Sequence, residues 1–373
     1  MHERQRYLEA QVRSDVKEKM VFIGGPRQVG KTTLAKRILD DDPDGYLNWD
    51  IPEHRERILR GEWPVSDLMV LDEIHKYRKW RGLLKGLYDQ WYPKKQIIVT
   101  GSARLDLYRH GGDSLQGRYH YLRLHPLSVA ELNIKTEKAF HDLLTLGGFP
   151  EPFFRGNLVT AKRWSREYRM RLLQEDVGSL ERIHDIGTME LLMLRLPALV
   201  GSPLSVNALR EDLQTSHKTV ERWLKILEKL YAIVRLPPFG SPLIRAVKKE
   251  QKHYHFDWSL VPAEAPRFEN LVASHLLKWV HAKQDTEGAD IELRYVRDIE
   301  GREVDFVICE GKSPRLAVEC KWNDADVDPS LRYLKARFPD MEAWQVSAVG
   351  KKDFLTRDGI RVAPALKLLS TLV

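Results

Sequence analysis

The chain has 373 residues, of which 43% are hydrophobic and 30% are charged, as in an ordinary globular protein large enough for two or three domains. This composition excludes a disordered, collagenous or disulfide-stapled chain. The two cysteines, Cys309 and Cys320, lack the spacing of a disulfide framework or a metal site and fit a reducing compartment. Because the sequence shows neither a long apolar run nor a signal-peptide pattern, we expect a cytoplasmic protein with no membrane partner.

The formal net charge is +7, from 60 Lys and Arg against 53 Asp and Glu. Residues 151–260 have the largest basic surplus, whereas residues 261–373 have a small acidic surplus. A basic segment is compatible with binding to a phosphate backbone, and carboxylates collect at metal sites. The charge pattern therefore favours the middle segment for a nucleic-acid contact.

The first part of the chain alternates short apolar runs with helical patterns. We expect buried strands at residues 20–24, 68–71 and 96–100, and a helix from Lys31 to Leu39. Strands that alternate with helices predict an α/β domain with a parallel sheet. The glycine- and proline-rich residues 146–150 mark the predicted end of this domain.

The residues between the first strand and the first helix match the P-loop pattern. Glycines let backbone N–H groups surround phosphates, and the helix N-terminus favours their negative charge. Lys31 is expected to contact the β- and γ-phosphates of ATP, and the Thr32 hydroxyl to bind Mg²⁺. The predicted nucleotide-binding residues here are Gly25, Pro26, Arg27, Gln28, Val29, Gly30, Lys31, Thr32 and Thr33.

The next two strands end in polar side chains. Asp72 is expected to hold Mg²⁺, and Glu73 to polarise the attacking water; this Asp-Glu pair favours an ATP hydrolase over a GTPase-type switch. The strand at residues 96–100 leads to Ser102, a candidate sensor of the γ-phosphate. For each strand, a solvated polar end is the alternative.

One arginine is a candidate for catalysis across a subunit boundary. In a ring-forming ATPase, an arginine reaches the γ-phosphate bound by the neighbouring subunit. Arg118 is our candidate, with Arg104 and Arg109 as rivals, and the alternative is an ordinary surface arginine. This assignment predicts a homo-oligomer, for which a hexameric ring is one form.

The middle segment predicts a winged helix-turn-helix after a helical stretch at residues 158–200. Serines that can cap helices open residues 205–213 and 216–230, and short strands are expected at residues 233–236 and 254–256. The second helix should bury Val220, Trp223, Leu224, Ile226 and Leu227.

The opposite face of that helix is basic, with Lys218, Arg222 and Lys225 as candidate DNA-binding residues. A merely solvated face is the alternative. No pair of side chains suited to bidentate base recognition is evident, so we expect recognition of DNA structure or backbone rather than sequence.

The last third mixes strands and helices. A helix is expected from Arg267 to Lys278, strands at residues 292–296, 303–309 and 316–320, and a further helix near Pro329.

Candidate metal chemistry lies on the last two of these strands. Glu319 and Lys321 share one face of their strand because the side-chain period is two, and Asp305 lies on the preceding strand. Two carboxylates and a lysine could bind Mg²⁺ and orient a nucleophilic water. A solvated Glu-x-Lys strand edge is the alternative.

The sequence resembles the bacterial and archaeal AAA+ P-loop ATPases that carry a C-terminal PD-(D/E)XK restriction-endonuclease-like domain. The shared motifs span nearly the whole chain: GPRQVGKTTLA, LMVLDEIHK, IIVTGSAR, GRY, LHPLSVAEL, GGFPEP, GREVDFVI and LAVECKW. The resemblance implies an AAA+-like ATPase domain at residues 1–150, a helical linker and winged helix-turn-helix at 151–260, and a restriction-endonuclease-like α/β domain at 261–373. It also makes Glu269 the additional acid of the metal site. One departure is the Phe-Asp-Trp-Ser-Leu segment at residues 256–260, where such proteins often have Asp-x-Gly-Leu.

Three functions follow as hypotheses. The first is a nucleoid-associated, DNA-dependent ATPase that translocates on or remodels duplex or branched DNA, as in helicase action or Holliday-junction branch migration, with the nuclease-like domain gripping DNA. The second is an ATP-regulated, metal-dependent endonuclease in defence or repair. The third is an ATP-dependent regulator that binds a protein partner, against which the basic middle segment argues.

Overall fold

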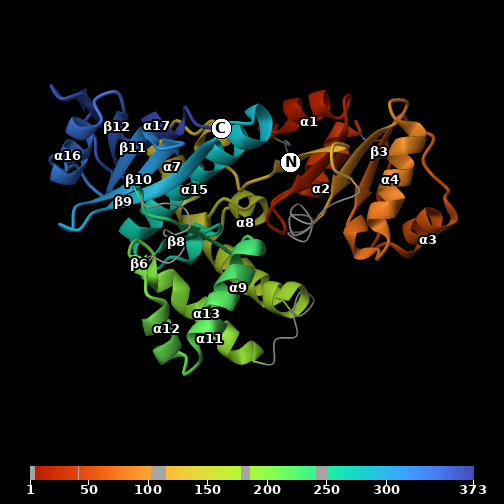
Figure 1. The fold of residues 1–373 in the computed structure, drawn as a ribbon, viewed down its shortest axis with the longest axis horizontal. Coiled ribbons are helices and arrows are strands. Elements are labelled where there is room, and N and C mark those ends of the chain that lie inside the picture. Colours follow the sequence, from red (N-terminus) through yellow and green to blue (C-terminus); the bar gives the residue numbers. More distant parts are fainter. Residues whose placement is uncertain (1–4, 41, 102–114, 178–184, 241–250) are drawn as a thin grey trace. The chain divides into compact units, whose positions relative to one another are not determined.

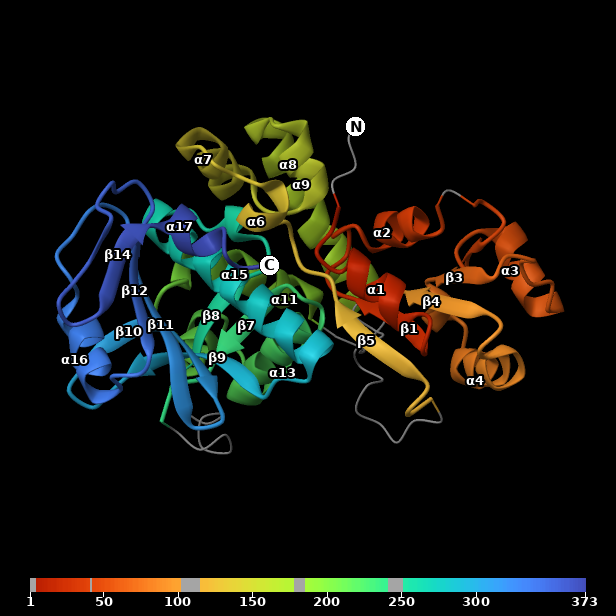
Figure 2. The ribbon, with the colours of Figure 1, turned by 90° about the horizontal axis from the view of Figure 1, so that it is seen from above.

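The computed structural model describes residues 5–40, 42–101, 115–177, 185–240 and 251–373. The chain divides into two compact units, shown in Figures 1 and 2. The first comprises residues 1–126 with two short segments, 229–231 and 285–287, and the second comprises the rest. The main segment of the first unit thus ends before residue 150, and most of residues 151–373 belong to the second unit. The division into three domains stays a prediction.

The described part of the first unit contains a five-stranded parallel sheet with the order β2-β3-β4-β1-β5. The three predicted strands are confirmed, and two further strands that the sequence did not reveal flank them. Their bounds are β1 Met20–Gly24, β2 Tyr46–Asn48, β3 Leu68–Asp72, β4 Gln96–Thr100 and β5 Tyr119–Arg123. Since all five are parallel, their carboxyl ends lie at one edge of the sheet.

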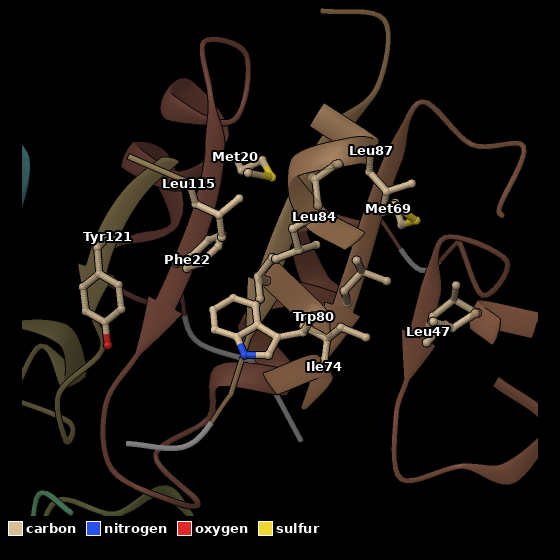
Figure 3. Packing of buried hydrophobic residues seen from close by; sticks show 14 residues of the cluster. Met20, Phe22, Leu47, Met69, Ile74, Trp80, Leu84, Leu87, Leu115 and Tyr121 are labelled. Atoms are coloured by element: carbon tan, nitrogen blue, oxygen red, sulfur yellow. The ribbon is translucent and has the colours of Figure 1, made fainter. Parts of the chain in front are cut away.

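Helices pack on this sheet, and one cluster of buried hydrophobic residues lies between them and the strands. The predicted helix after the P-loop is confirmed as α2, and α4 packs its apolar face on the strands (Figure 3). Trp80 of α4 lies 6.2 Å from the ring of Phe22, a residue of β1, and Leu84 and Leu87 continue the same face. The helices are α1 Glu9–Asp15, α2 Lys31–Ile38, α3 Pro52–Arg60, the 3-10 turn η1 Ile74–Lys76 and α4 Trp80–Trp91.

The second unit begins with a helical region, as the sequence predicts for residues 158–200 in their described parts. A π-helical turn follows the longest of its early helices. The elements are α6 Val129–Leu132, α7 Glu137–Leu146, α8 Pro150–Arg155, α9 Leu158–Arg171, the π-helical turn η2 Leu172–Val177, α11 Ile186–Arg195 and the 3-10 turn η3 Leu196–Leu199.

Two capped helices and a small sheet follow. Ser205 accepts a hydrogen bond from the Ala208 N–H at the start of α12 (Val206–Asp212), and Ser216 accepts one from the Thr219 N–H at the start of α13 (His217–Lys229). Both caps were predicted. A three-stranded antiparallel sheet has the order β6-β8-β7. Its strands are β6 Pro203–Leu204, β7 Ile233–Leu236 and β8 Gln251–His255, so the last strand begins earlier than predicted.

The last part contains a long helix and a mixed sheet, both visible in Figure 2. The strand order of this sheet is β13-β14-β12-β11-β10-β9. The predicted strands and the helix near Pro329 are confirmed, and the predicted helix at 267–278 is longer at both ends. The elements are the 3-10 turn η4 Trp258–Leu260, α15 Glu264–Glu287, β9 Ile291–Arg297, β10 Glu303–Glu310, β11 Ser313–Lys321, α16 Pro329–Arg337, β12 Glu342–Ser347, β13 Phe354–Leu355, β14 Ile360–Pro364 and α17 Ala365–Leu369. Among the described residues, no helix combines the length and apolar character needed to cross a membrane.

Candidate nucleotide site and carboxylate cluster

The loop between β1 and α2 has the backbone conformation that its glycines permit. Gly25 has φ 129° and Gly30, at the N-terminus of α2, has φ 102°, values that residues with a Cβ rarely adopt. A Cβ on Gly25 would also lie 2.3 Å from the Leu124 carbonyl oxygen. Both glycines are therefore required by the shape of the loop.

The side chain of Lys31 turns back over this loop. It is buried, and its ammonium donates hydrogen bonds to the carbonyl oxygens of Gly25 at 3.0 Å and Pro26 at 2.6 Å. The positive charge is thus held inside the loop rather than in solvent.

Asp72, at the end of β3, is the centre of a buried hydrogen-bond network. Its carboxylate accepts hydrogen bonds from the hydroxyls of Thr32 at 2.8 Å, Tyr46 at 2.6 Å and Thr100 at 2.5 Å. Asn48 donates to the Tyr46 hydroxyl at 3.0 Å. The strand order explains the network, because β2 and β4 flank β3 and all three end at the same edge.

Sequence reasoning missed Tyr46 and Asn48. Burial, together with the neighbouring Asp72 carboxylate, raises the pKa of the Tyr46 hydroxyl. The available signal was the alternation of the two residues, which places both on one face of a strand.

Glu73 follows Asp72 in a left-handed backbone conformation, with φ 57°. Its N–H donates to the Thr100 carbonyl at 2.9 Å, and its carboxylate lies 3.3 Å from the Lys76 ammonium. Burial raises the pKa of Glu73, and Asp72 raises it further, whereas Lys76 and Lys31 lower it. A partly buried carboxylate with a raised pKa is suited to accept a proton from water.

These residues fit a nucleotide with Mg²⁺. The Thr32 hydroxyl and the Asp72 carboxylate are oxygen donors held together, as this metal prefers, and the Lys31 ammonium offers the complementary charge for phosphates. Ser102, Arg104 and Arg109 lie outside the described residues. Thr100, which is described, directs its hydroxyl to Asp72.

Arg118 lies at the opposite edge of the sheet. The next residue, Tyr119, pairs with Met20 at the start of β1, whereas the P-loop follows Gly24 at its end. Four residues of strand separate the two edges by about 13 Å, beyond the reach of an arginine side chain. Arg118 forms an ion pair with Asp89 of α4 at 2.8 Å. A catalytic role for Arg118 would therefore be directed at another subunit, and it stays a prediction.

The first segment of the chain matches a known family. Residues 17–133 match the model described as "AAA domain". They form an AAA-type P-loop ATPase domain. Residues 137–270 and 266–368 match two models, each described as a domain of unknown function (DUF8612 and DUF4143). The restriction-endonuclease-like character expected of the last third thus stays a prediction.

Relatives occur in bacteria and archaea. An uncharacterized protein of Mycobacterium tuberculosis is 24% identical over 94% of this chain and 81% of its own length. Another, of Methanocaldococcus jannaschii, is 24% identical over 63% of this chain and 60% of its own length.

Two solved structures show distant likeness. The Thermotoga maritima RuvB Holliday junction branch migration motor has a TM-score of 0.28 and 20% identity, over 61% of this chain and 85% of that one. A Pyrococcus horikoshii signal transduction ATPase with a tetratricopeptide repeat sensor has a TM-score of 0.22 and 15% identity, over 75% of this chain and 47% of that one. Such TM-scores are too low to support a common overall architecture.

The predicted basic face of α13 is confirmed as a surface. Lys218, Arg222 and Lys225 are exposed, at the three- and four-residue spacing that places them on one side of the helix. The predicted apolar side is buried.

Asp305, Glu319 and Lys321 lie close together at the centre of the C-terminal sheet. Glu319 accepts a hydrogen bond from the Asp305 N–H at 3.3 Å and pairs with Lys321 at 2.8 Å. Lys321 also pairs with Asp328, at the N-terminus of α16, at 2.8 Å. Burial, with a contribution from Asp305, raises the pKa of Glu319 to about 8.

The carboxylates do not fit a metal ion as arranged. Among the residues the structure describes, no three His, Cys, Asp or Glu side chains are grouped so that they could hold one. The metal-binding roles expected of Glu269, Asp305 and Glu319 stay a prediction. The ammonium of Lys252 lies beside Glu269 and Asp305.

Proposed function

We propose that this protein hydrolyses ATP with Mg²⁺ and uses the energy to translocate on or remodel duplex or branched DNA. The observation that carries the enzymatic part is the Asp72 network, which joins the P-loop hydroxyl of Thr32 to the strand end that presents Glu73. Lys31 binds phosphate oxygens, Thr32 and Asp72 hold the metal, and Glu73 orients water and accepts its proton. Bound Mg²⁺ would offset negative charge on the transferred phosphate.

The DNA-directed part of the proposal is supported by the basic face of α13. This helix follows α12 after a short turn, and it is followed by β7 and β8, which form a small antiparallel sheet with β6. This arrangement is compatible with a winged helix-turn-helix. The exposed cations of α13 would contact phosphates and give affinity without strong sequence preference. Branched DNA such as a Holliday junction is one substrate class for such a motor.

Removing this basic face should weaken DNA binding in a salt-dependent way. We expect the variant with Lys218→Ala, Arg222→Ala and Lys225→Ala to lose up to about three phosphate contacts, lowering the slope of log K against log[salt] by about 0.9 per contact. Fluorescence anisotropy with labelled duplex over a salt series measures this.

A matched control removes the same charge elsewhere. Lys135, Lys138 and Lys312 are exposed and dispersed in the same unit, and their replacement by alanine should leave the salt slope nearly unchanged. Equal losses in both triple variants would argue against α13 as the DNA-binding helix.

Replacing Arg118 with alanine should leave ATP binding nearly intact while slowing hydrolysis by about 10³-fold or more, if it acts on the neighbouring subunit. Mixing the Arg118→Ala and Glu73→Gln proteins should restore some phosphate release, because some interfaces then pair an intact site with an intact arginine. Asp89→Ala is the control, since it removes the ion-pair partner at 2.8 Å but keeps the arginine. Absence of recovery on mixing would count against the assignment.

A further inference from the structure

Lys252 is a fully buried lysine on β8, and its side chain has no solvent exposure. Its ammonium lies 2.7 Å from Glu303, 3.1 Å from Asp305 and 3.3 Å from Glu269. The carboxylates come from β10 and α15, so one cation joins the small sheet of β6, β7 and β8 to the C-terminal sheet and its helix. These residues all belong to the same compact unit.

Two side chains of β8, those of Lys252 and Tyr254, contact the carboxylates of this cluster. Tyr254 is two residues after Lys252 and therefore projects from the same face of the strand. Its hydroxyl donates to the same Glu269 oxygen that Lys252 contacts, at 2.7 Å. The other Asp305 oxygen accepts a hydrogen bond from the Cys320 N–H at 2.9 Å, so both oxygens of that carboxylate are engaged.

The charges explain why a lysine is stable in this place. An unpaired buried ammonium is costly, but nearby carboxylates compensate for burial and keep the pKa of Lys252 raised. The ammonium already occupies the space between these carboxylate oxygens, so a divalent cation that approached them would be repelled by its charge. Lysine and metal are therefore alternatives for one place.

We propose that Lys252 replaces a metal ion in this cluster, so that an internal ammonium neutralises Glu269, Glu303 and Asp305 and the domain holds nucleic acid without cleaving it. The inference rests on the DNA-directed part of the proposed function and adds that the C-terminal domain does not cut the DNA. The test measures metal binding and not ATP hydrolysis, so this inference and the proposed function can fail separately.

The test is calorimetric titration of the nucleotide-free full chain with Mn²⁺. We expect wild type and Asp305→Asn to give the same isotherm, because the ammonium already fills the site. Lys252→Ala should gain a site of at least about tenfold higher affinity, and adding Asp305→Asn should abolish the gain. Lys252→Arg keeps the charge and should show no gain. Any Mn²⁺ bound by Thr32 and Asp72 would be common to every variant.

Either of two kinds of result would overturn the proposal, namely metal-dependent behaviour of wild type or its absence in Lys252→Ala. One is Mn²⁺ binding to wild type that Asp305→Asn removes, or Mn²⁺-dependent nicking of plasmid DNA that Asp305→Ala, Glu319→Ala and Lys321→Ala remove. The other is a folded Lys252→Ala variant, checked by circular dichroism, with no gain in Mn²⁺ affinity. If Lys252→Ala does not fold, the Mn²⁺ isotherms of wild type and Asp305→Asn still test the proposal, because a difference between them would contradict it.

Discussion

Lys31→Ala is expected to abolish ATP hydrolysis, lowering its rate by at least about 10²–10³-fold, as removal of one positioned charge-stabilising group typically does. The variant removes the ammonium that lies within the P-loop, hydrogen bonded to the Gly25 and Pro26 carbonyls. Phosphate release measures hydrolysis, and equilibrium binding of a fluorescent ATP analogue shows how much affinity is lost as well.

A matched control removes a lysine from the same unit. Lys85 is exposed on α4, and Lys85→Ala should hydrolyse ATP at the wild-type rate. Lys31→Arg tests geometry, since it keeps the charge but presents a planar fork instead of a compact ammonium; we expect it to be impaired. If Lys31→Ala hydrolysed ATP at the wild-type rate, the P-loop lysine would not be required for hydrolysis.

Glu73→Gln is expected to bind ATP and hydrolyse it about 10²–10⁴-fold more slowly, the usual size of a general-base contribution. The change preserves the shape of the side chain and removes its ability to accept a proton. Single-turnover hydrolysis, together with an independent binding measurement, separates the chemical step from affinity.

The pH dependence gives a second sign of the same role. Because burial raises the pKa of Glu73, wild-type hydrolysis should fall on acidification at a higher pH than an ordinary carboxyl would cause. Glu73→Gln should lack this limb of the profile. The exposed Glu62 supplies a control, and Glu62→Gln should match wild type. Normal turnover by Glu73→Gln would require another base.

The phosphate site was predictable because its signals are local. β1, β3 and β4 are central strands whose residues are mostly buried, so each appears in the sequence as an apolar run. β2 has three residues, and β5 is a half-buried edge strand with polar residues. Neither stands out by hydrophobicity, and Tyr46 was missed with β2.

The C-terminal cluster was only partly predictable because it depends on distant contacts. Asp305, Glu319 and Lys321 follow from the alternation of side chains on adjacent strands. Lys252 meets Asp305 across 53 residues of sequence, and fully buried lysines are rare, so pattern alone favours a surface position. In the structure, Asp305 pairs with Lys252 and Glu319 pairs with Lys321.

The most direct test of the central claim compares the ATP hydrolysis rate with and without DNA, using linear duplex and a four-way junction at low salt. We predict a several-fold stimulation by DNA that disappears in Lys31→Ala and is reduced by the triple substitution at Lys218, Arg222 and Lys225. Hydrolysis by wild type at the same rate with and without either DNA would contradict a DNA-directed motor, and no hydrolysis under any condition would contradict the ATPase itself.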